Sequence, residues 1–102
     1  MPANGKIIID AGASKALLQK GASLLPSGII DSEGEFKKGD AVQIILKDGK
    51  GAKEIAKGIS RYSSADLKKI HGKKSSEIKN ILGYFVTEEV VNRDELVLTS
   101  ED

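Results

Sequence analysis

The stretch AVQIILKDGKGAKEIAKGIS, residues 41–60, predicts a β-hairpin and so points to the class of the fold. Val42, Ile44 and Leu46 alternate along it and would share one face of an extended strand over residues 41–46. Asp48-Gly49 is a favoured turn pair, which places the hairpin loop at residues 47–53 and the returning strand at 54–60.

Outside the hairpin, the sequence alternates between short strands and helices. Residues 6–10 predict a strand, and Asp10 is suited to cap a helix over residues 13–20 that ends at Gly21. Residues 22–31 predict a second strand, bent or at an edge because Pro26 cannot donate to a ladder. Near the end, residues 85–91 and 95–98 add one or two more strands.

The segment GISRYSSADLKKIHGKKSSEIKNILGY, residues 58–84, predicts two short helices. Ser63 and Asp66 match a capping box, and Gly72 would end the first helix. Ser75 or Ser76 would cap the second, which would end at Gly83. The lysines of both helices lie largely off the apolar stripes, and the pattern suits a solvated face or an anion-facing surface equally well.

These elements predict an α+β fold that is mostly β with short helices. Short turns between the strands favour mainly antiparallel pairing in a small, partly closed barrel. We expect a flexible start at residues 1–5, a single domain at residues 6–98 and an acidic tail at residues 99–102.

Composition narrows the functional classes. There is no cysteine, no apolar run of the roughly 20 residues that span a bilayer and no secretory signal, so we expect a cytoplasmic protein with no membrane partner. The formal net charge is +1, but residues 60–80 are basic and the residues after 81 are acidic. With only two Tyr and two Phe, the chain has little from which to build a base-stacking platform.

Motifs for chemistry are weak. GKKSS at residues 72–76 has a lysine where a phosphate-binding P-loop needs a hydroxyl, and KDGKGAKE lacks the third glycine of a dinucleotide fingerprint. One histidine without cysteines, and acidic residues without the spacing of a calcium loop, support no metal site. Ser63, Ser64, Asp66 and His71 are the residue types of a nucleophilic site, but helix capping accounts for them better.

Several segments together carry a resemblance to a known family. KGASLLPSGI (20–29), FKKGD (36–40), GISRYSSADLKKIHG (58–72) and SSEIKNILGY (75–84) resemble the C-terminal PUA domain of bacterial glutamate 5-kinases. The resemblance implies a PUA-like pseudo-barrel of mainly antiparallel strands. It also implies an upstream amino-acid kinase domain that uses ATP and Mg, makes glutamyl 5-phosphate for proline synthesis and carries any homo-oligomer. None of that domain is in this chain, so we expect no catalytic residue, cofactor or metal here.

Two functions follow from the resemblance and remain open. The first is an accessory, regulatory domain of the kinase. The second is an RNA-binding module, since the wider PUA family binds RNA through the turn after the first helix. The residues at that turn are Lys20, Gly21, Ala22 and Ser23, and charge alone adds Lys68, Lys69, Lys73 and Lys74 as candidate phosphate contacts.

Overall fold

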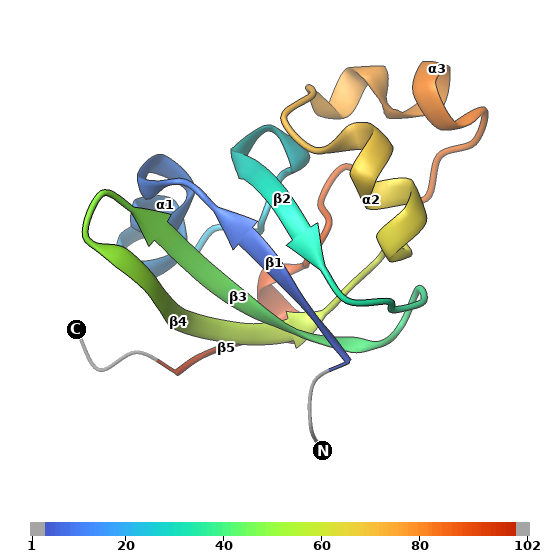
Figure 1. Cartoon of the computed structure of the whole chain (residues 1–102). Helices are drawn as coiled ribbons and strands as arrows, with labels where there is room; N and C mark the ends of the chain where they lie inside the picture. The colour runs from blue at the N-terminus through green and yellow to red at the C-terminus, as the bar shows by residue number, and fades with distance from the viewer. Residues whose placement is uncertain (1–3, 100–102) are drawn as a thin grey trace.

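The computed structural model describes residues 4–99, which form one five-stranded sheet with short helices around it (Figure 1). Most of the expected flexible start, residues 1–3, and most of the expected acidic tail, residues 100–102, lie outside the described residues.

The strands are β1 (Gly5–Ile9), β2 (Ile29–Glu33), β3 (Ala41–Asp48), β4 (Gly51–Ile59) and β5 (Leu96–Leu98). They lie in the order β2-β1-β3-β4-β5. β1 pairs with β3 in parallel, and the other three neighbouring pairs are antiparallel. The prediction of an α+β fold with mainly antiparallel strands is therefore confirmed.

Short helices occupy the connections. They are α1 (Ala11–Lys20), α2 (Ser64–Ile70) and α3 (Ile78–Leu82), with 3₁₀ turns η1 (Pro26–Gly28), η2 (Ser75–Glu77) and η3 (Arg93–Glu95). Figure 1 shows α1 at one end of the sheet, and α2 with α3 at the other end, beside β2. The helices thus divide between two ends of the molecule.

The core lies on one face of β1 and β3. Ile7 pairs with Ile44 across the parallel ladder, and both side chains are fully buried. Leu17 of α1 and Leu67 of α2 pack into the same cluster. Burial of each such side chain stabilises the fold by about 1.5–3 kcal/mol, so one continuous core supports both groups of helices.

Two predicted strands are wrong in extent or kind. The strand predicted over residues 22–31 begins only at Ile29, because Pro26 starts a 3₁₀ turn in which its missing N–H is not needed. The segment 85–91 is not a strand: its only ladder contact among the described residues is one bridge between Val91 and Leu24.

Two local predictions also need correction. The hairpin loop is shorter than residues 47–53, because β3 runs to Asp48 and β4 starts at Gly51. Neither Ser75 nor Ser76 caps the second helix. Both belong to the 3₁₀ turn η2 that leads into α3, and Glu77 is the N-cap residue of α3 itself. Lys74 is the N-cap residue of η2, and its N–H donates to the Glu77 carboxylate at 3.2 Å. The Ser75 hydroxyl instead donates to the carbonyl oxygen of Glu88 at 3.0 Å.

Candidate functional site

A groove runs beside α1 at the turn predicted from the sequence. Asp10 caps the helix by accepting from the Ala13 N–H at 2.8 Å, and Gly21 ends it at φ 60°, a left-handed conformation that suits glycine. The groove has a volume of about 360 Å³. It is lined by Asp10, Gly12, Ala13, Ala16, Ala22, Ser23, Leu24, Leu25, Ser27 and Gly28.

Small residues let the two walls of the groove approach closely. A Cβ on Gly28 would lie 2.6 Å from the Cβ of Ala13, a separation that real side chains do not adopt. The Gly28 carbonyl oxygen also accepts from the Asp10 N–H at 3.1 Å, which ties η1 to the start of α1. The close approach and this backbone hydrogen bond together fix η1 against the start of α1.

The turn after α1 is hydrogen-bonded to residues 90–93, near the C-terminal end of the described chain. The Ser23 hydroxyl accepts from the Arg93 N–H at 2.9 Å. Leu24 donates to the Val91 carbonyl oxygen at 2.9 Å and accepts from the Val90 N–H at 2.7 Å. Of the four predicted turn residues, Ala22 and Ser23 line the groove, while Lys20 and Gly21 do not.

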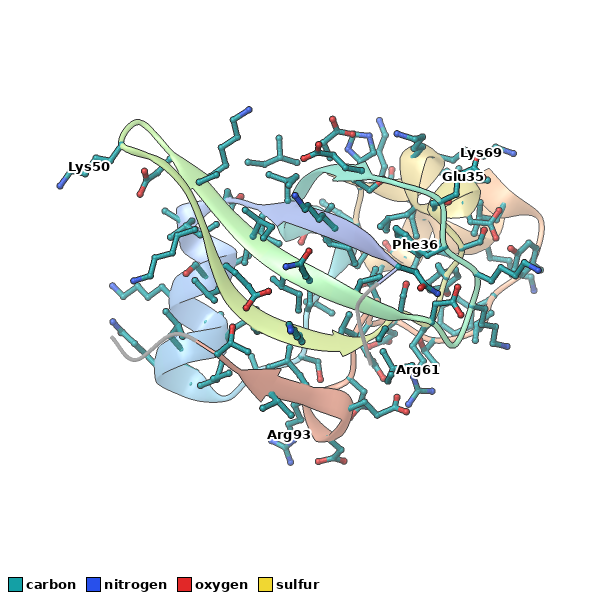
Figure 2. The ribbon with its side chains drawn as sticks, turned by 60° about the horizontal axis from the view of Figure 1, so that its bottom comes forward. Glu35, Phe36, Lys50, Arg61, Lys69 and Arg93 are labelled. Carbon is teal, nitrogen blue, oxygen red and sulfur yellow. The ribbon has the colours of Figure 1, made fainter. Side chains whose placement is uncertain are left out.

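The candidate lysines do not gather around this groove. Lys20, Lys68, Lys69, Lys73 and Lys74 are all exposed, and none of them is among the residues lining it. Figure 2 shows Lys69 at the opposite end of the ribbon from α1. Lys68 turns towards the sheet: its ammonium group donates to the Ser32 carbonyl oxygen at 3.3 Å and lies 4.0 Å from the Asp31 carboxylate.

One link does connect the two ends of the molecule. The N–H of Gly72, just after α2, donates to the Pro26 carbonyl oxygen in η1 at 2.7 Å. The end of α2 therefore touches the side of η1, whereas Lys20 sits at the far end of α1. The structure thus separates Lys20 from the α2 lysines rather than forming one basic face.

The SRYSS motif, residues 60–64, holds loops together. The Ser60 hydroxyl donates to the Tyr62 carbonyl oxygen at 2.6 Å, and the Ser63 hydroxyl accepts from the Asp66 N–H at 3.2 Å as the cap of α2. The Ser64 hydroxyl bonds both the N–H and the carbonyl oxygen of Phe36, at 3.2 and 3.3 Å. Because these hydroxyls are engaged with the backbone, a nucleophilic site built on them has no support.

Tyr62 makes more hydrogen bonds through its side chain than any serine of this motif does, and the sequence analysis did not single it out. Its ring is 1% exposed. Its hydroxyl donates to the Thr87 carbonyl oxygen at 2.6 Å and accepts from the N–H groups of Val86 and Thr87 at 3.2 and 3.1 Å. A tyrosine preceded by polar residues in a loop looks like a surface residue. Its structural role becomes visible only from its hydrogen-bond partners, which lie about 25 residues further along the chain.

A family model for the PUA domain matches residues 5–82 of the chain. The chain belongs to the PUA domain family. A solved structure agrees with the fold: a PUA domain from Aeropyrum pernix K1, in a tartrate complex, has a TM-score of 0.59 and 24% identity. That comparison covers 87% of this chain and 41% of the other.

Glutamate 5-kinases are similar to this PUA domain over almost its whole length. The enzyme from Xanthomonas oryzae pv. oryzae (strain KACC10331 / KXO85) is 51% identical over 94 residues, which cover 92% of this chain and 26% of that protein. For Trichlorobacter lovleyi the identity is 52%, over 92% of this chain and 24% of that protein. For Shewanella woodyi the identity is 48%, over 94% of this chain and 25% of that protein. The chain spans about a quarter of the length of these relatives, so it corresponds to their PUA region.

Two carboxylates of this PUA domain have perturbed acidity. The backbone N–H of Lys37, followed by the side chain of Asn4, lowers the pKa of the Asp40 carboxyl. The side chain of Gln43, followed by that of Thr99, lowers the pKa of Glu54. Hydrogen bonds to the charged form cause both shifts, so these groups stabilise loops and strands in the ionised state and are poor proton donors.

Two kinds of feature are absent from the described part of the chain. Across residues 4–99 no three His, Asp or Glu side chains come together in a group that could hold a metal ion. Within the same residues no helix is long and apolar enough to cross a membrane.

Proposed function

We propose that this chain is the accessory PUA domain of a glutamate 5-kinase, in which it tunes the regulation or assembly of the catalytic part. The observation that carries the proposal is the identity of about 50% over 92% of the chain to proteins that are about four times as long. In this proposal the missing part binds ATP, Mg and glutamate and makes glutamyl 5-phosphate for proline biosynthesis. Residues 6–98 form the accessory unit, and the parent enzyme is cytoplasmic and homo-oligomeric.

The engaged hydroxyls of SRYSS support an accessory role over an independent catalytic one. The hydroxyls of Ser63 and Ser64 are hydrogen-bonded to backbone groups, and His71 is the C-cap residue of α2. A site for group transfer needs a nucleophile that is free to meet a base and a substrate. The chain would therefore act through the protein that carries it.

Kinetics of a parent enzyme test this role. The Xanthomonas oryzae glutamate 5-kinase is compared in three forms: intact, with its PUA region deleted, and with that region replaced by this chain. We expect deletion to change the feedback response or the oligomer size, and replacement to restore the intact behaviour. Identical activity, feedback response and oligomer size in all three forms would contradict the proposal.

The groove beside α1 supports RNA binding as a second candidate function. Its lining includes Ala22 and Ser23, at the turn that the family resemblance assigns to RNA, and its walls are small enough for a backbone to approach. Asp10 is the only charged residue in the lining, which weakens the case for phosphate contacts there. Lys20 would have to supply the nearby positive charge.

Salt dependence tests the RNA candidate. Binding of a structured RNA, followed by fluorescence at two salt concentrations, should weaken steeply with salt because each neutralised phosphate releases counterions. Lys20→Ala should reduce the affinity and the salt slope, while Lys50→Ala, at the hairpin tip in Figure 2, should not. Absence of binding at low salt would reject this function for the chain.

A further inference from the structure

Three large apolar side chains are exposed together at the end of α3. Ile81 is 37% exposed, Tyr84 46% and Phe85 48%. They fall within five consecutive residues, at the corner of the molecule where Figure 1 places α3. We call these three residues the α3 patch. Single exposed apolar residues are ordinary. Two exposed aromatic rings on one short segment make it a candidate contact surface, because aromatic residues are enriched in protein–protein interfaces.

The backbone on both sides of the α3 patch is fixed. Gly83 ends α3 at φ 84°, and its N–H donates to the Lys79 carbonyl oxygen at 2.8 Å. On the other side, the Tyr62 hydroxyl holds Val86 and Thr87. The two aromatic residues therefore sit on a short segment anchored at each end. Because this segment is already ordered, it would lose little conformational entropy when a partner binds, and this favours affinity.

A groove next to the α3 patch adds a polar rim. Phe85 lines it together with Ser75, Ser76, Lys79 and Glu88, and its volume is about 500 Å³. Aromatic residues surrounded by polar ones are the composition of protein–protein contact sites. The groove carries one basic residue, Lys79, and one acidic residue, Glu88, so it has no net positive charge with which to hold a phosphate backbone. This mixed rim favours a protein partner over a nucleic acid.

The position of the α3 patch along the chain indicates which protein. The match to the general PUA domain model ends at residue 82, before Tyr84 and Phe85. The match to glutamate 5-kinases covers 94 of the 102 residues, so the eight residues left out are too few for it to stop before Phe85. Both aromatic residues thus lie outside the general PUA match and inside the glutamate 5-kinase match. About three quarters of each such relative lies outside this matched region and could supply the partner surface.

We propose that the α3 patch is the surface on which this PUA domain docks against the remaining part of a glutamate 5-kinase. This inference rests on the proposed accessory function and names its contact site. The phenyl ring of Phe85 and the phenol ring of Tyr84 are the central contacts, and Ser75, Ser76, Lys79 and Glu88 form the rim.

Hydrogen exchange tests the docking surface in a full-length protein. The PUA region of the Xanthomonas oryzae enzyme is replaced by this chain, and amide exchange at residues 81–86 is compared between this chimera and the 102-residue chain alone. We expect exchange in the chimera to slow by about tenfold or more, as it does when a stable contact must open first. Equal exchange in the two proteins would overturn the proposal.

Matched substitutions separate this patch from other exposed apolar residues. Tyr84→Ser with Phe85→Ser in the chimera should abolish the added protection, whereas Val97→Ser, at a residue of β5 that is 68% exposed, should leave it intact. All three side chains are exposed, so the variants of the isolated chain should keep the wild-type melting temperature and circular dichroism. A loss of protection caused equally by Val97→Ser would place the contact elsewhere and overturn the assignment.

Three further outcomes also have defined meanings. Protection of residues 81–86 in the isolated chain that grows with its concentration identifies a second copy as the occupant and contradicts the proposal. Protection by added RNA contradicts it as well. An enzyme whose feedback response requires the domain, but whose α3 patch stays unprotected, refutes only this docking surface and leaves the accessory function standing.

Discussion

Replacing Tyr62 with phenylalanine should destabilise this domain far more than the loss of one hydroxyl from a surface residue. The substitution keeps the buried ring and removes only the oxygen, which bonds Val86 and Thr87 through one donated and two accepted hydrogen bonds. Each intramolecular hydrogen bond contributes about 1 kcal/mol net, and water can replace part of the loss because the site is only partly buried. We therefore expect the free energy of unfolding to fall by about 2 kcal/mol.

Urea denaturation followed by circular dichroism measures this change, and a domain of this size should also melt roughly 8–16 °C lower. Tyr84→Phe is the matched control, because Tyr84 is 46% exposed and surface substitutions usually change stability by less than about 0.5 kcal/mol. Faster amide exchange at Val86 and Thr87 in Tyr62→Phe would locate the loss. If the free energy of unfolding of Tyr62→Phe lies within about 0.5 kcal/mol of the wild-type value, the assignment of Tyr62 as the anchor of Val86 and Thr87 is wrong.

Three shorter predictions concern other parts of the fold. Hydrogen bonds lower the folded-state pKa values of Asp40 and Glu54, so the stability that these groups contribute is present above their unfolded pKa values of about 4 and is lost as pH falls from there through the lower folded values. Asp40→Asn and Glu54→Gln should therefore flatten the decline in the free energy of unfolding measured by urea titrations from pH 6 to 3. Gly28→Ala should lower the free energy of unfolding, measured by urea titration, by about 1–3 kcal/mol, because its new methyl group meets Ala13. An unchanged urea midpoint would show that η1 and α1 can move apart to accommodate it. Ser63→Ala should lower the free energy of unfolding by about 1 kcal/mol through loss of the α2 cap. A thermal melt identical to wild type would show that this cap does not stabilise the domain.

Local sequence signals predicted those elements whose causes are local. Asp10, Gly21, Ser63 and Gly83 start or end helices where expected, because capping depends on a few neighbouring residues. The β3–β4 hairpin was predicted for the same reason, since its turn and its alternating apolar residues are adjacent in the chain.

The errors fall where distant contacts decide the structure. Residues 85–91 have the β-branched composition of a strand, yet the Tyr62 hydroxyl, 25 residues away from Thr87, bonds the backbone groups of Val86 and Thr87 where a neighbouring strand would otherwise pair. The placement of the lysines was also beyond local signals, because spacing along α2 cannot show that Lys68 turns back to Ser32. The candidate phosphate contacts at these lysines stay a prediction. The groove at Ala22 and Ser23 came from the family resemblance, and charge alone would have pointed away from it.

The attachment of the turn after α1 to residues 90–93 affects how this domain can be cut from a longer protein. The match to the general PUA domain model stops at residue 82, but Leu24 takes its backbone partners from Val90 and Val91, and Ser23 takes its partner from Arg93. A chain truncated at residue 82 would leave these groups, and the hydroxyl of Tyr62, without their partners. The smallest piece that folds therefore extends past the end of the general PUA match, and an excised version should continue at least through Arg93.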